Sequence, residues 1–397
     1  MITAAEAAVL DAVDDGGAVG LLHDLVRARS VWPQDTEEAA ARVVADRLEA
    51  AGIPTVLDHV APGRPNVLAE IGRGDGPTLL WNAHLDTVPP GNAAAWTADP
   101  FGGDVRDGKL FGRGASDDKG GVAVMAAAAM AVAARGGVRG TLKLSFVIGE
   151  ETGHVGTRAA LQRGLTADLA VVGEWSGASR IGVGYRGALW LAFEVRGRAA
   201  HGSRPMRGLN AIDLMTEQVL PRLKATPMTF ERHPVFMIQE PTWNVGTIEG
   251  GLSTNVVADH CRATTDLRLV PGQDPAAVLE LLREQLRGVT YPNGEPAPVE
   301  LTVLNSIGPF VTPVEHPVVA TLAASIRDVL GEEPGYFGKT GISDANALAH
   351  EGKIPSVAYG PGNPSGHEPN EYVELTELGR CTRVLAVSAL RACGGGA

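Results

Sequence analysis

The chain has few cysteines, no excess of positive charge and no long hydrophobic run, and each absence excludes a class of protein. Only three cysteines, Cys261, Cys381 and Cys393, occur in 397 residues, and they form no metal-ligand spacing. This usage suits a reducing compartment, so we expect the protein in the cytoplasm. The net charge of −12 argues against binding to nucleic acid or to an anionic membrane surface.

The sequence also shows no pattern typical of a targeting or membrane-spanning segment. Residues 1–17 are acidic and lack a basic region before an apolar run, so we expect no secretory signal. The alanine-rich helix expected after Gly121 is too short to span a bilayer. The chain shows no internal repeat and no long low-complexity tract. With 44% hydrophobic residues it can bury a large core, and we expect two domains.

The most informative segment runs from Trp81 to Gly91 (WNAHLDTVPPG). A hydrophobic strand over residues 78–81 leads into His84 and Asp86, which leave the strand end on the same face because side chains alternate along a strand. A carboxylate one pleat from an imidazole can hold the second ring nitrogen of a metal-ligating histidine. Taken alone, such a histidine is more often a surface or hydrogen-bonded residue than a metal ligand.

Two glycine-flanked segments add carboxylates. The turn GRGASDDKGG at 112–121 delivers Asp117 to the start of an apolar helix over 122–134, where it could also be a simple N-cap. The segment GEETG at 149–153 ends a strand over 141–148 with Glu150 and Glu151. Two adjacent acids at a strand end are costly unless a cation holds them or one of them takes up a proton.

Two more strand ends complete a possible ligand set. The apolar strand LAVVGE stops at Glu174, and the loop GPGNPSGHEPNEY after a strand over 355–359 carries His367. In an open α/β sheet, ligands bind beyond the carboxyl ends of the strands, and we expect these side chains to converge there. Two imidazoles with a surplus of carboxylates suit zinc, with manganese or cobalt as substitutes.

The order of these motifs identifies a family resemblance. The sequences H-x-D-T-V-P, G-R-G-x-x-D-x-K-G-G, G-E-E-x-G, a later G-E and H-x-x-N-E-Y occur between Asn66 and Tyr372. The set resembles the dinuclear zinc hydrolases that include acetylornithine deacetylase, succinyl-diaminopimelate desuccinylase, aminoacylase and glutamate carboxypeptidases. The resemblance implies an amidohydrolase or metallopeptidase with a zinc-exopeptidase-like α/β domain, whose mixed central sheet is flanked by helices.

The resemblance also implies a role for each residue of the set. One Zn²⁺ would bind His84, Asp117 and Glu174, and a second would bind Asp117, Glu151 and His367, so that Asp117 bridges the two. Glu150 would be the general base on the bridging water, and Asp86 would orient His84. The peptide bond between Asp117 and Asp118 would be cis.

The middle of the chain has a different pattern. After a Ser/Gly-rich joint at 176–179 we predict a β-α-β-β-α-β order, with strands over 188–195, 243–248, 258–269 and 299–303 and helices over 210–223 and 275–286. This is the order of a ferredoxin-like unit, although a simple extension of the sheet is the alternative. The family inserts such a unit as a lid. We therefore expect a catalytic domain over 1–180 and 307–397 and a lid or dimerisation domain over 181–306.

Three residues of the lid have roles implied by the resemblance. His201, in GRAAHGSRPMRGLNA, would donate a hydrogen bond to the tetrahedral oxyanion. In dimeric members this histidine reaches the partner's active site, so we expect a homodimer through the lid. Asn255 and Arg268 would line the pocket for the substrate carboxylate, a task that suits the bidentate geometry of arginine. By themselves, these residues could also be surface groups paired with neighbouring backbone or acids.

Three departures from the family pattern bear on the substrate. Trp175 replaces the proline common after the metal-binding glutamate, and Asp118 stands where a neutral residue is frequent. Asn346, a candidate substrate contact, occurs where desuccinylases tend to carry arginine, which weakens succinyl-diaminopimelate as the substrate. We predict a deacylase or deacetylase of small N-acyl amino acids. A carboxypeptidase or dipeptidase acting on short peptides is the alternative.

Other classes of function fit the sequence less well. A non-catalytic relative that binds a peptide or metabolite would have no need of Glu150 as a base. A lidless aminopeptidase would lack the inserted β-α-β-β-α-β segment. The segment GVGYRG at 182–187 precedes a strand instead of joining a strand to a helix, so it is no dinucleotide-binding turn. The GRGASDDKGG turn likewise lacks the residues that flank the lysine of a Walker sequence.

Overall fold

The computed structural model describes residues 1–394, which divide into two compact units. Unit 1 comprises residues 1–184, 311–339 and 343–394, and unit 2 comprises residues 185–310 and 340–342. The chain leaves unit 1 at the end of strand β8 (Arg180–Tyr185) and returns at strand β13 (Phe310–Val311). Unit 2 is therefore an insertion into the chain of unit 1.

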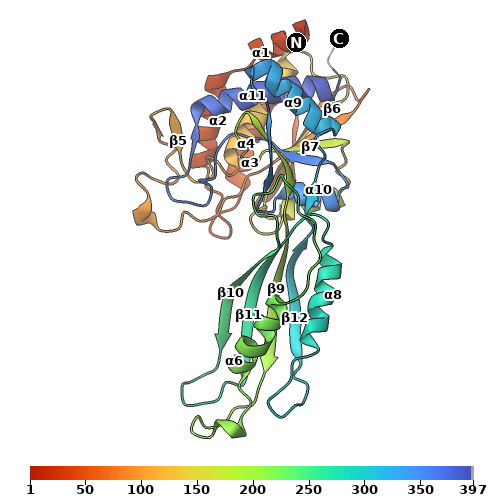
Figure 1. Ribbon diagram of the computed structural model, residues 1–397. Coiled ribbons are helices and arrows are strands. Elements are labelled where there is room, and N and C mark those ends of the chain that lie inside the picture. Colours follow the sequence, from red (N-terminus) through yellow and green to blue (C-terminus); the bar gives the residue numbers. More distant parts are fainter. Residues whose placement is uncertain (395–397) are drawn as a thin grey trace. The chain divides into compact units, whose positions relative to one another are not determined.

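A nine-stranded mixed sheet forms the centre of unit 1 (Figure 1). The strand order is β1-β2-β6-β3-β7-β15-β8-β13, and β14 pairs with β8. Strands β6, β3, β7 and β15 are parallel neighbours, whereas β1 and β2 form an antiparallel edge. The remaining strands are β1 (Thr55–Ala61), β2 (Arg64–Gly72), β3 (Thr78–His84), β6 (Thr141–Val147), β7 (Leu169–Val172), β14 (Gly335–Lys339) and β15 (Ser356–Ala358).

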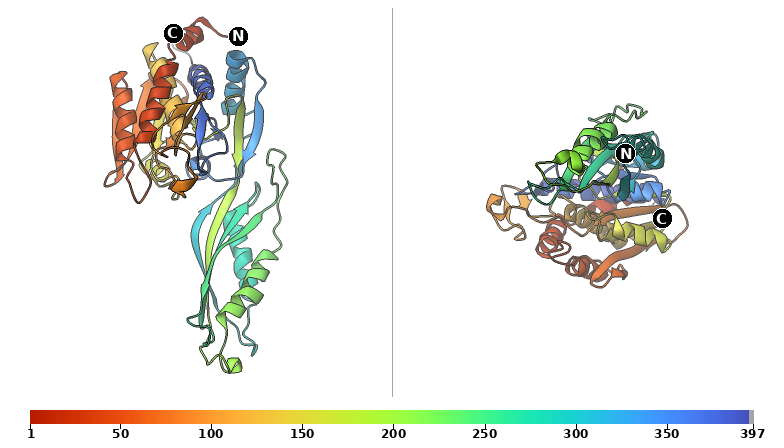
Figure 2. Two further views of the ribbon diagram at one scale, coloured as in Figure 1. Left: turned by 90° about the vertical axis from the view of Figure 1, so that its left-hand side faces the viewer. Right: turned by 90° about the horizontal axis from the view of Figure 1, so that it is seen from below.

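Helices cover both faces of this sheet (Figure 2). The connection β3–α4–β6 crosses the sheet in one direction and β6–α5–β7 in the other, so right-handed crossovers place α4 and α5 on opposite faces. Helix α11 packs on α4, and α10 packs on α5. The helices are α1 (Ala4–Asp11), α2 (Asp15–Arg27), α3 (Glu38–Ala50), α4 (Lys119–Ala134), α5 (Val155–Gln162), α9 (Pro317–Leu330), α10 (Asp344–His350) and α11 (Leu375–Ala392).

Helix α4 is apolar on nearly all sides because it lies between strand β3 and helices α2 and α11. Its many alanine and glycine residues, with at most a methyl side chain, allow these neighbours to approach closely. At its first residue, the buried Lys119 donates hydrogen bonds from Nζ to the carbonyl oxygens of Leu25 and Ala28, at 2.9 and 2.8 Å. The beginning of α4 is therefore tied to the end of α2, which fixes the position of the loop that carries Asp117.

A small sheet of unit 1 joins two loops that are distant in sequence. Its order is β16-β5-β4, with β4 (Val105–Arg106), β5 (Lys109–Phe111) and β16 (Tyr372–Glu374). Strand β16 pairs antiparallel with β5, so Tyr372 lies opposite Phe111. The loop that carries His367 is thereby brought to the loop that carries Asp117.

Unit 2 is a four-stranded antiparallel sheet with helices packed on one face. The strand order is β10-β11-β9-β12, and alternate residues of β11 are buried against the helices. Its elements are β9 (Gly187–Arg196), α6 (Ala211–Leu214), a π-helical turn (Met215–Val219), α7 (Leu220–Lys224), β10 (Thr242–Gly250), β11 (His260–Leu269), α8 (Pro275–Leu286) and β12 (Val299–Ile307). The predicted mixed α/β sheet and ferredoxin-like β-α-β-β-α-β unit are confirmed. Among the helices within residues 1–394, none combines the length and apolar character needed to cross a membrane.

Candidate metal centre and active site

The carboxyl ends of three parallel strands bring four candidate residues to one edge of the central sheet. His84 is the last residue of β3, Glu150 and Glu151 follow β6, and Glu174 follows β7. Because β6, β3 and β7 are parallel neighbours, their ends meet at the same edge. The sheet therefore aligns these side chains without any contribution from unit 2.

Two loops add the remaining candidates and complete two groups of three. The ligand atoms of His84, Asp117 and Glu174 all lie within 4.8 Å of one another. Those of Asp117, Glu151 and His367 meet the same limit. Asp117 belongs to both groups, so the five side chains form one continuous cluster that could hold two adjacent ions.

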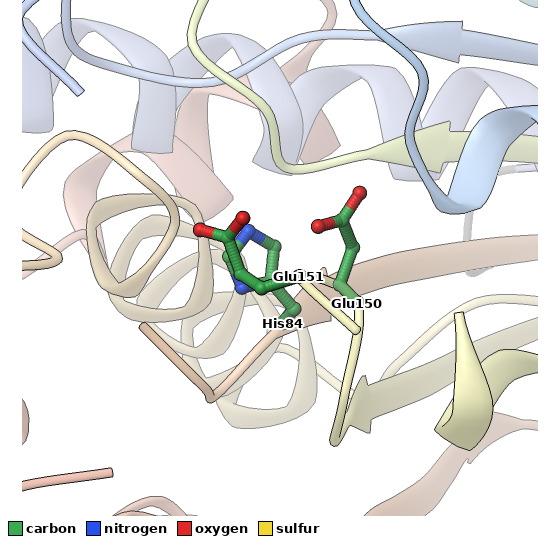
Figure 3. Close-up of side chains that lie close together, drawn as sticks. All are labelled: His84, Glu150 and Glu151. Atoms are coloured by element: carbon green, nitrogen blue, oxygen red, sulfur yellow. The ribbon is translucent and has the colours of Figure 1, made fainter. Parts of the chain in front are cut away.

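Glu150 adjoins this cluster without belonging to either group. Figure 3 shows Glu150 and Glu151 extending from the same turn beside the ring of His84, and ligand atoms of these three residues also lie within 4.8 Å of one another. Nδ1 of His154 lies 3.6 Å from Oε1 of Glu150. A carboxylate beside these two ligand groups, and a member of neither, is suited to proton transfer.

His84 is oriented mainly by backbone groups. Its Nδ1 lies 2.9 Å from the carbonyl oxygen of Asp86 and 3.7 Å from the Asp86 carboxylate. Because the carbonyl can only accept, Nδ1 carries a proton. A protonated Nε2 can donate to Oδ1 of Asp117 at 3.0 Å, and loss of that proton frees the Nε2 lone pair for an ion. The Asp86 carboxylate instead accepts from the backbone N–H groups of Glu150 and Glu151, both at 3.1 Å. Asp86 thus orients the ring through its carbonyl and the adjacent turn through its carboxylate.

The loop before α4 is held by a glutamate from the far end of the chain. The carboxylate of Glu371 accepts hydrogen bonds from Nη1 of Arg113 and from three backbone N–H groups between Gly114 and Asp117, at 2.5 to 3.1 Å. The peptide bond between Asp117 and Asp118 is cis, as the resemblance predicts. Glu371 belongs to the H-x-x-N-E-Y motif, so the sequence marked this residue. Its role in holding the loop before α4 was not predicted.

A second missed residue is Lys339, whose Nζ donates to Oε2 of Glu174 at 2.6 Å. Both side chains are buried, and they are 165 positions apart in the sequence. Nζ also lies 4.2 Å from the ring centroid of Trp175, which stacks on Phe337. Trp175, which departs from the family pattern, therefore forms an aromatic wall beside the ion pair.

The cluster holds more acidic than basic groups, and the pKa values reflect this. Burial disfavours the charged ring of His84, but a hydrogen bond with Asp117 and nearby carboxylates outweigh burial and raise the His84 pKa well above its ordinary value. A hydrogen bond with Glu151 raises the pKa of His367 to about 9. Burial raises the pKa of Glu150 well above its ordinary value; His84 opposes the shift and Glu151 reinforces it. Protons on the imidazoles thus compensate charge that divalent cations could compensate instead.

In unit 2, the structure places His201 and Asn255 on adjacent backbone segments. His201 forms an antiparallel bridge with Val256, and the N–H of Gly202 donates to the carbonyl oxygen of Asn255 at 2.7 Å. Nδ1 of His201 accepts from the N–H of Ser203 at 3.1 Å. The neutral His201 ring therefore carries its proton on Nε2, which makes that atom a hydrogen-bond donor.

Arg268 lies at the opposite end of the unit 2 sheet. It stands near the end of β11, whereas the Asn255 loop precedes the first residue of that strand, His260. At about 3.3 Å per residue, His260 and Arg268 are about 26 Å apart. Nε and Nη2 of Arg268 donate to the carboxylate of Asp266 at 3.1 and 2.9 Å.

Asn346 lies within helix α10 of unit 1 and is completely buried. Its Oδ1 accepts from the N–H of Ser343 at 2.9 Å, and the two residues form a capping box. The structure therefore gives Asn346 a helix-capping role.

Sequence comparison identifies a family and curated relatives of this chain. The model of peptidase family M20/M25/M40 matches residues 80–391. The chain is 33% identical over 376 residues to a succinyl-diaminopimelate desuccinylase of Cereibacter sphaeroides, covering 91% of this chain and 94% of the relative. It is 30% identical over 382 residues to an acetylornithine deacetylase of Photorhabdus laumondii, covering 93% and 95%.

The fold is also similar to that of a solved enzyme. The crystal structure of an M20 family metallo-carboxypeptidase, Sso-CP2 from Sulfolobus solfataricus, superposes with a TM-score of 0.77 at 22% identity and covers 94% of this chain and 98% of its own. A family match over most of the sequence, with relatives aligned along nine-tenths of it, shows that the chain belongs to peptidase family M20/M25/M40.

Proposed function

We propose that this protein is a two-metal hydrolase that cleaves the amide bond of N-acyl amino acids. The observation that carries the proposal is that two three-residue ligand groups share Asp117, while Glu150 is a member of neither and lies with His84 and Glu151 in a third group beside them. The names of the two relatives, a desuccinylase and a deacetylase, support removal of an acyl group. A binding protein would have no use for the additional carboxylate.

The residues fit two Zn²⁺ ions. His84, Asp117 and Glu174 would hold one ion, and Asp117, Glu151 and His367 the other. Mixed imidazole and carboxylate ligands are typical of zinc, and Co²⁺ or Mn²⁺ can often replace it. Bound metals in such a site lower the pKa of a water molecule and polarise the carbonyl group of the amide.

The side chains around the ions would then move one proton. Glu150 would accept the proton of the attacking water on its carboxylate and deliver it to the leaving nitrogen. The raised pKa of Glu150 suits a group that holds this proton between the two events. Asp86 would keep the turn of Glu150 and Glu151 in place through its two hydrogen bonds with their N–H groups.

Contacts with the substrate would come from unit 2 acting as a lid. Nε2–H of His201 would donate to the oxyanion, with Asn255 beside it, and Arg268 would bind the substrate carboxylate. About 26 Å of strand separates the Asn255 loop from Arg268, so a small N-acyl amino acid cannot reach both ends of one sheet. We therefore propose a homodimer in which the two groups come from different copies of the chain. The three cysteines, buried and free, support the cytoplasm as its compartment.

A hydrolysis screen tests the proposed activity. The zinc-loaded protein is incubated with N-acetyl amino acids, N-succinyl amino acids and dipeptides, and the products are identified by mass spectrometry. We expect cleavage of N-acyl amino acids, loss of activity after chelation, and recovery with Zn²⁺ or Co²⁺. Glu150→Gln should retain the wild-type metal content and lose about a thousandfold or more in kcat.

Three outcomes of this screen are distinct. Cleavage of dipeptides alone would assign the protein as a carboxypeptidase or dipeptidase instead. Absence of hydrolysis of every amide would refute the proposed function. A Glu150→Gln variant with near wild-type kcat would refute the assignment of the base.

A further inference from the structure

His154 is a buried histidine that belongs to none of the candidate ligand groups. It precedes helix α5 and follows Glu150 by four positions, and its backbone has φ +60°, a left-handed conformation that few residues other than glycine adopt. Its side chain is 1% exposed. A large polar ring in this backbone conformation and this environment requires a partner inside the protein.

Two carboxylates from different elements face the ring. Nδ1 of His154 lies 3.6 Å from Oε1 of Glu150 and 3.3 Å from Oδ1 of Asp344. Asp344 is the first residue of helix α10, and it is also 1% exposed. Within residues 1–394, His154 is the only basic side chain within 4 Å of the Glu150 carboxylate. The imidazole is therefore the link between Glu150 and a second buried acid.

The polar atoms of this group are otherwise unsatisfied. Within the described chain, neither ring nitrogen of His154 and neither oxygen of Asp344 has a hydrogen-bond partner of good geometry. Buried carboxylates and imidazoles without partners are costly, so a well-folded protein keeps them only where they serve each other or a reaction. Both acids can accept from Nδ1–H. These acceptor oxygens, 3.6 and 3.3 Å from Nδ1, can share its single proton.

We propose that His154 is a positioning residue for Glu150 and that Asp344 holds His154 in place. Nδ1–H of His154 restrains one oxygen of the Glu150 carboxylate, so that the other oxygen is directed to the water and the leaving nitrogen. Asp344 fixes the orientation and the protonated nitrogen of the ring. This inference rests on the proposed function, in which Glu150 moves the proton.

Substitutions of His154 that keep or remove a hydrogen-bond donor at the position of Nδ1 test the proposal. In His154→Asn, the amide nitrogen stands near the position of Nδ1, whereas His154→Leu fills the space without any donor. We expect His154→Leu to lose about a hundredfold in kcat with KM and zinc content unchanged, because proton transfer of this type contributes that much or more. His154→Asn should recover about tenfold of that loss, since it restores the donor.

A matched control and a double variant separate positioning from folding. Thr157 is buried one turn further along α5 and accepts a hydrogen bond from Asn82, so Thr157→Val disturbs the same helix without touching Glu150. Its kcat should stay within about threefold of wild type. Asp344→Asn should lower kcat, and adding it to His154→Leu should lower kcat no further, because the two residues act through one contact.

Several results would overturn the proposal. A His154→Leu variant with near wild-type kcat would do so, and so would a loss of kcat in proportion to a loss of zinc. The proposal also fails if Thr157→Val loses as much kcat as His154→Leu, or if His154→Asn has no higher kcat than His154→Leu. If the wild type hydrolyses no amide, the proposed function fails, and the contact is judged by urea unfolding of the metal-free protein. There, His154→Leu and Asp344→Asn should be coupled by about fivefold or more in the unfolding equilibrium constant. Additive effects on unfolding would refute the contact.

Discussion

Carboxylates around the two histidines of the cluster favour the protonated forms of both rings. The pKa of His367 is raised to about 9, and that of His84 is raised well above its ordinary value. An imidazole nitrogen can bind a metal only after it loses its proton. A metal ion and a proton therefore compete for the same ring nitrogen of each histidine. Charge compensation in this cluster therefore links metal binding to pH.

This competition predicts that proton release accompanies metal binding. The His367 pKa of about 9 keeps that ring protonated at pH 7, and the pKa of His84 is shifted in the same direction, so binding of two Zn²⁺ ions should release at least one proton per chain. Release should decrease when the pH rises above the pKa of His367, about 9, because that ring is then already neutral. Calorimetric titrations in buffers of different ionisation enthalpy measure the number. A binding enthalpy independent of buffer at pH 7 would contradict the prediction.

Lys339 compensates Glu174 when no metal does so. Breaking a buried ion pair on one side leaves an uncompensated charge, so Lys339→Met should destabilise the metal-free protein by about 3 to 5 kcal/mol. Zn²⁺ should stabilise this variant more than it stabilises the wild type, because the ion takes over the compensation of Glu174. Urea unfolding with and without Zn²⁺ measures both effects.

A double variant provides the control for Lys339. Glu174→Gln removes the charge that Lys339→Met leaves unpaired, so the double variant should be more stable without metal than Lys339→Met alone. Equal stability of these two variants would show that the ion pair does not cause the destabilisation.

At the scale of elements, strand ends position most of the site and a distant loop positions Asp117. The small sheet of β16, β5 and β4 joins the two loops, and Glu371 gathers three N–H groups of the loop before α4. A glutamine at this position would place an N–H₂ group against some of these donors and leave Arg113 without a counter-charge. The loop that presents Asp117 would then lose its anchor.

Glu371→Gln should therefore reduce metal binding although Glu371 belongs to neither ligand group. We expect about tenfold or greater loss of zinc affinity, as is usual for residues that orient metal ligands. Glu374→Gln, at an exposed position three residues later, is the matched control and should bind two ions as the wild type does. Zinc content after dialysis is measured by mass spectrometry. Equal content in both variants would contradict the role of Glu371.

Local sequence patterns predicted these elements well because their signals are local. Hydrophobic periodicity predicted helix α8 with its observed bounds and strand β3 over 78–81, which the structure extends to His84, and the β-α-β-β-α-β order followed from counting such segments. The motif order identified the residues that meet at the strand ends. Contacts such as Lys339 with Glu174 or Asp344 with His154 could not be predicted in this way. They depend on tertiary packing between segments far apart in sequence, for which no periodic pattern exists.

At the scale of the whole molecule, unit 2 separates its candidate residues along one sheet. His201 and Asn255 lie near one end and Arg268 near the other, about 26 Å away along the strand. Two copies of the chain would be needed if all three residues contact one small substrate. The proposed homodimer has a direct functional consequence.

Mixing two inactive variants should restore activity. In a mixed dimer of Glu150→Gln and His201→Ala, one active site combines an intact Glu150 with an intact His201 from the other chain. We expect the two variants, unfolded and refolded together, to recover about a quarter of wild-type activity, while each alone stays inactive. Activity assays and sedimentation measure recovery and dimer content. Mixed dimers without activity would show that His201 acts within its own chain.

The proposal that two metal ions share Asp117 is tested most directly by anomalous diffraction at the zinc edge from crystals grown with Zn²⁺. The account predicts two peaks per chain about 3.5 to 4 Å apart. One peak should lie against His84 and Glu174, the other against Glu151 and His367, with Asp117 between them. A single peak, or peaks away from Asp117, would contradict the account.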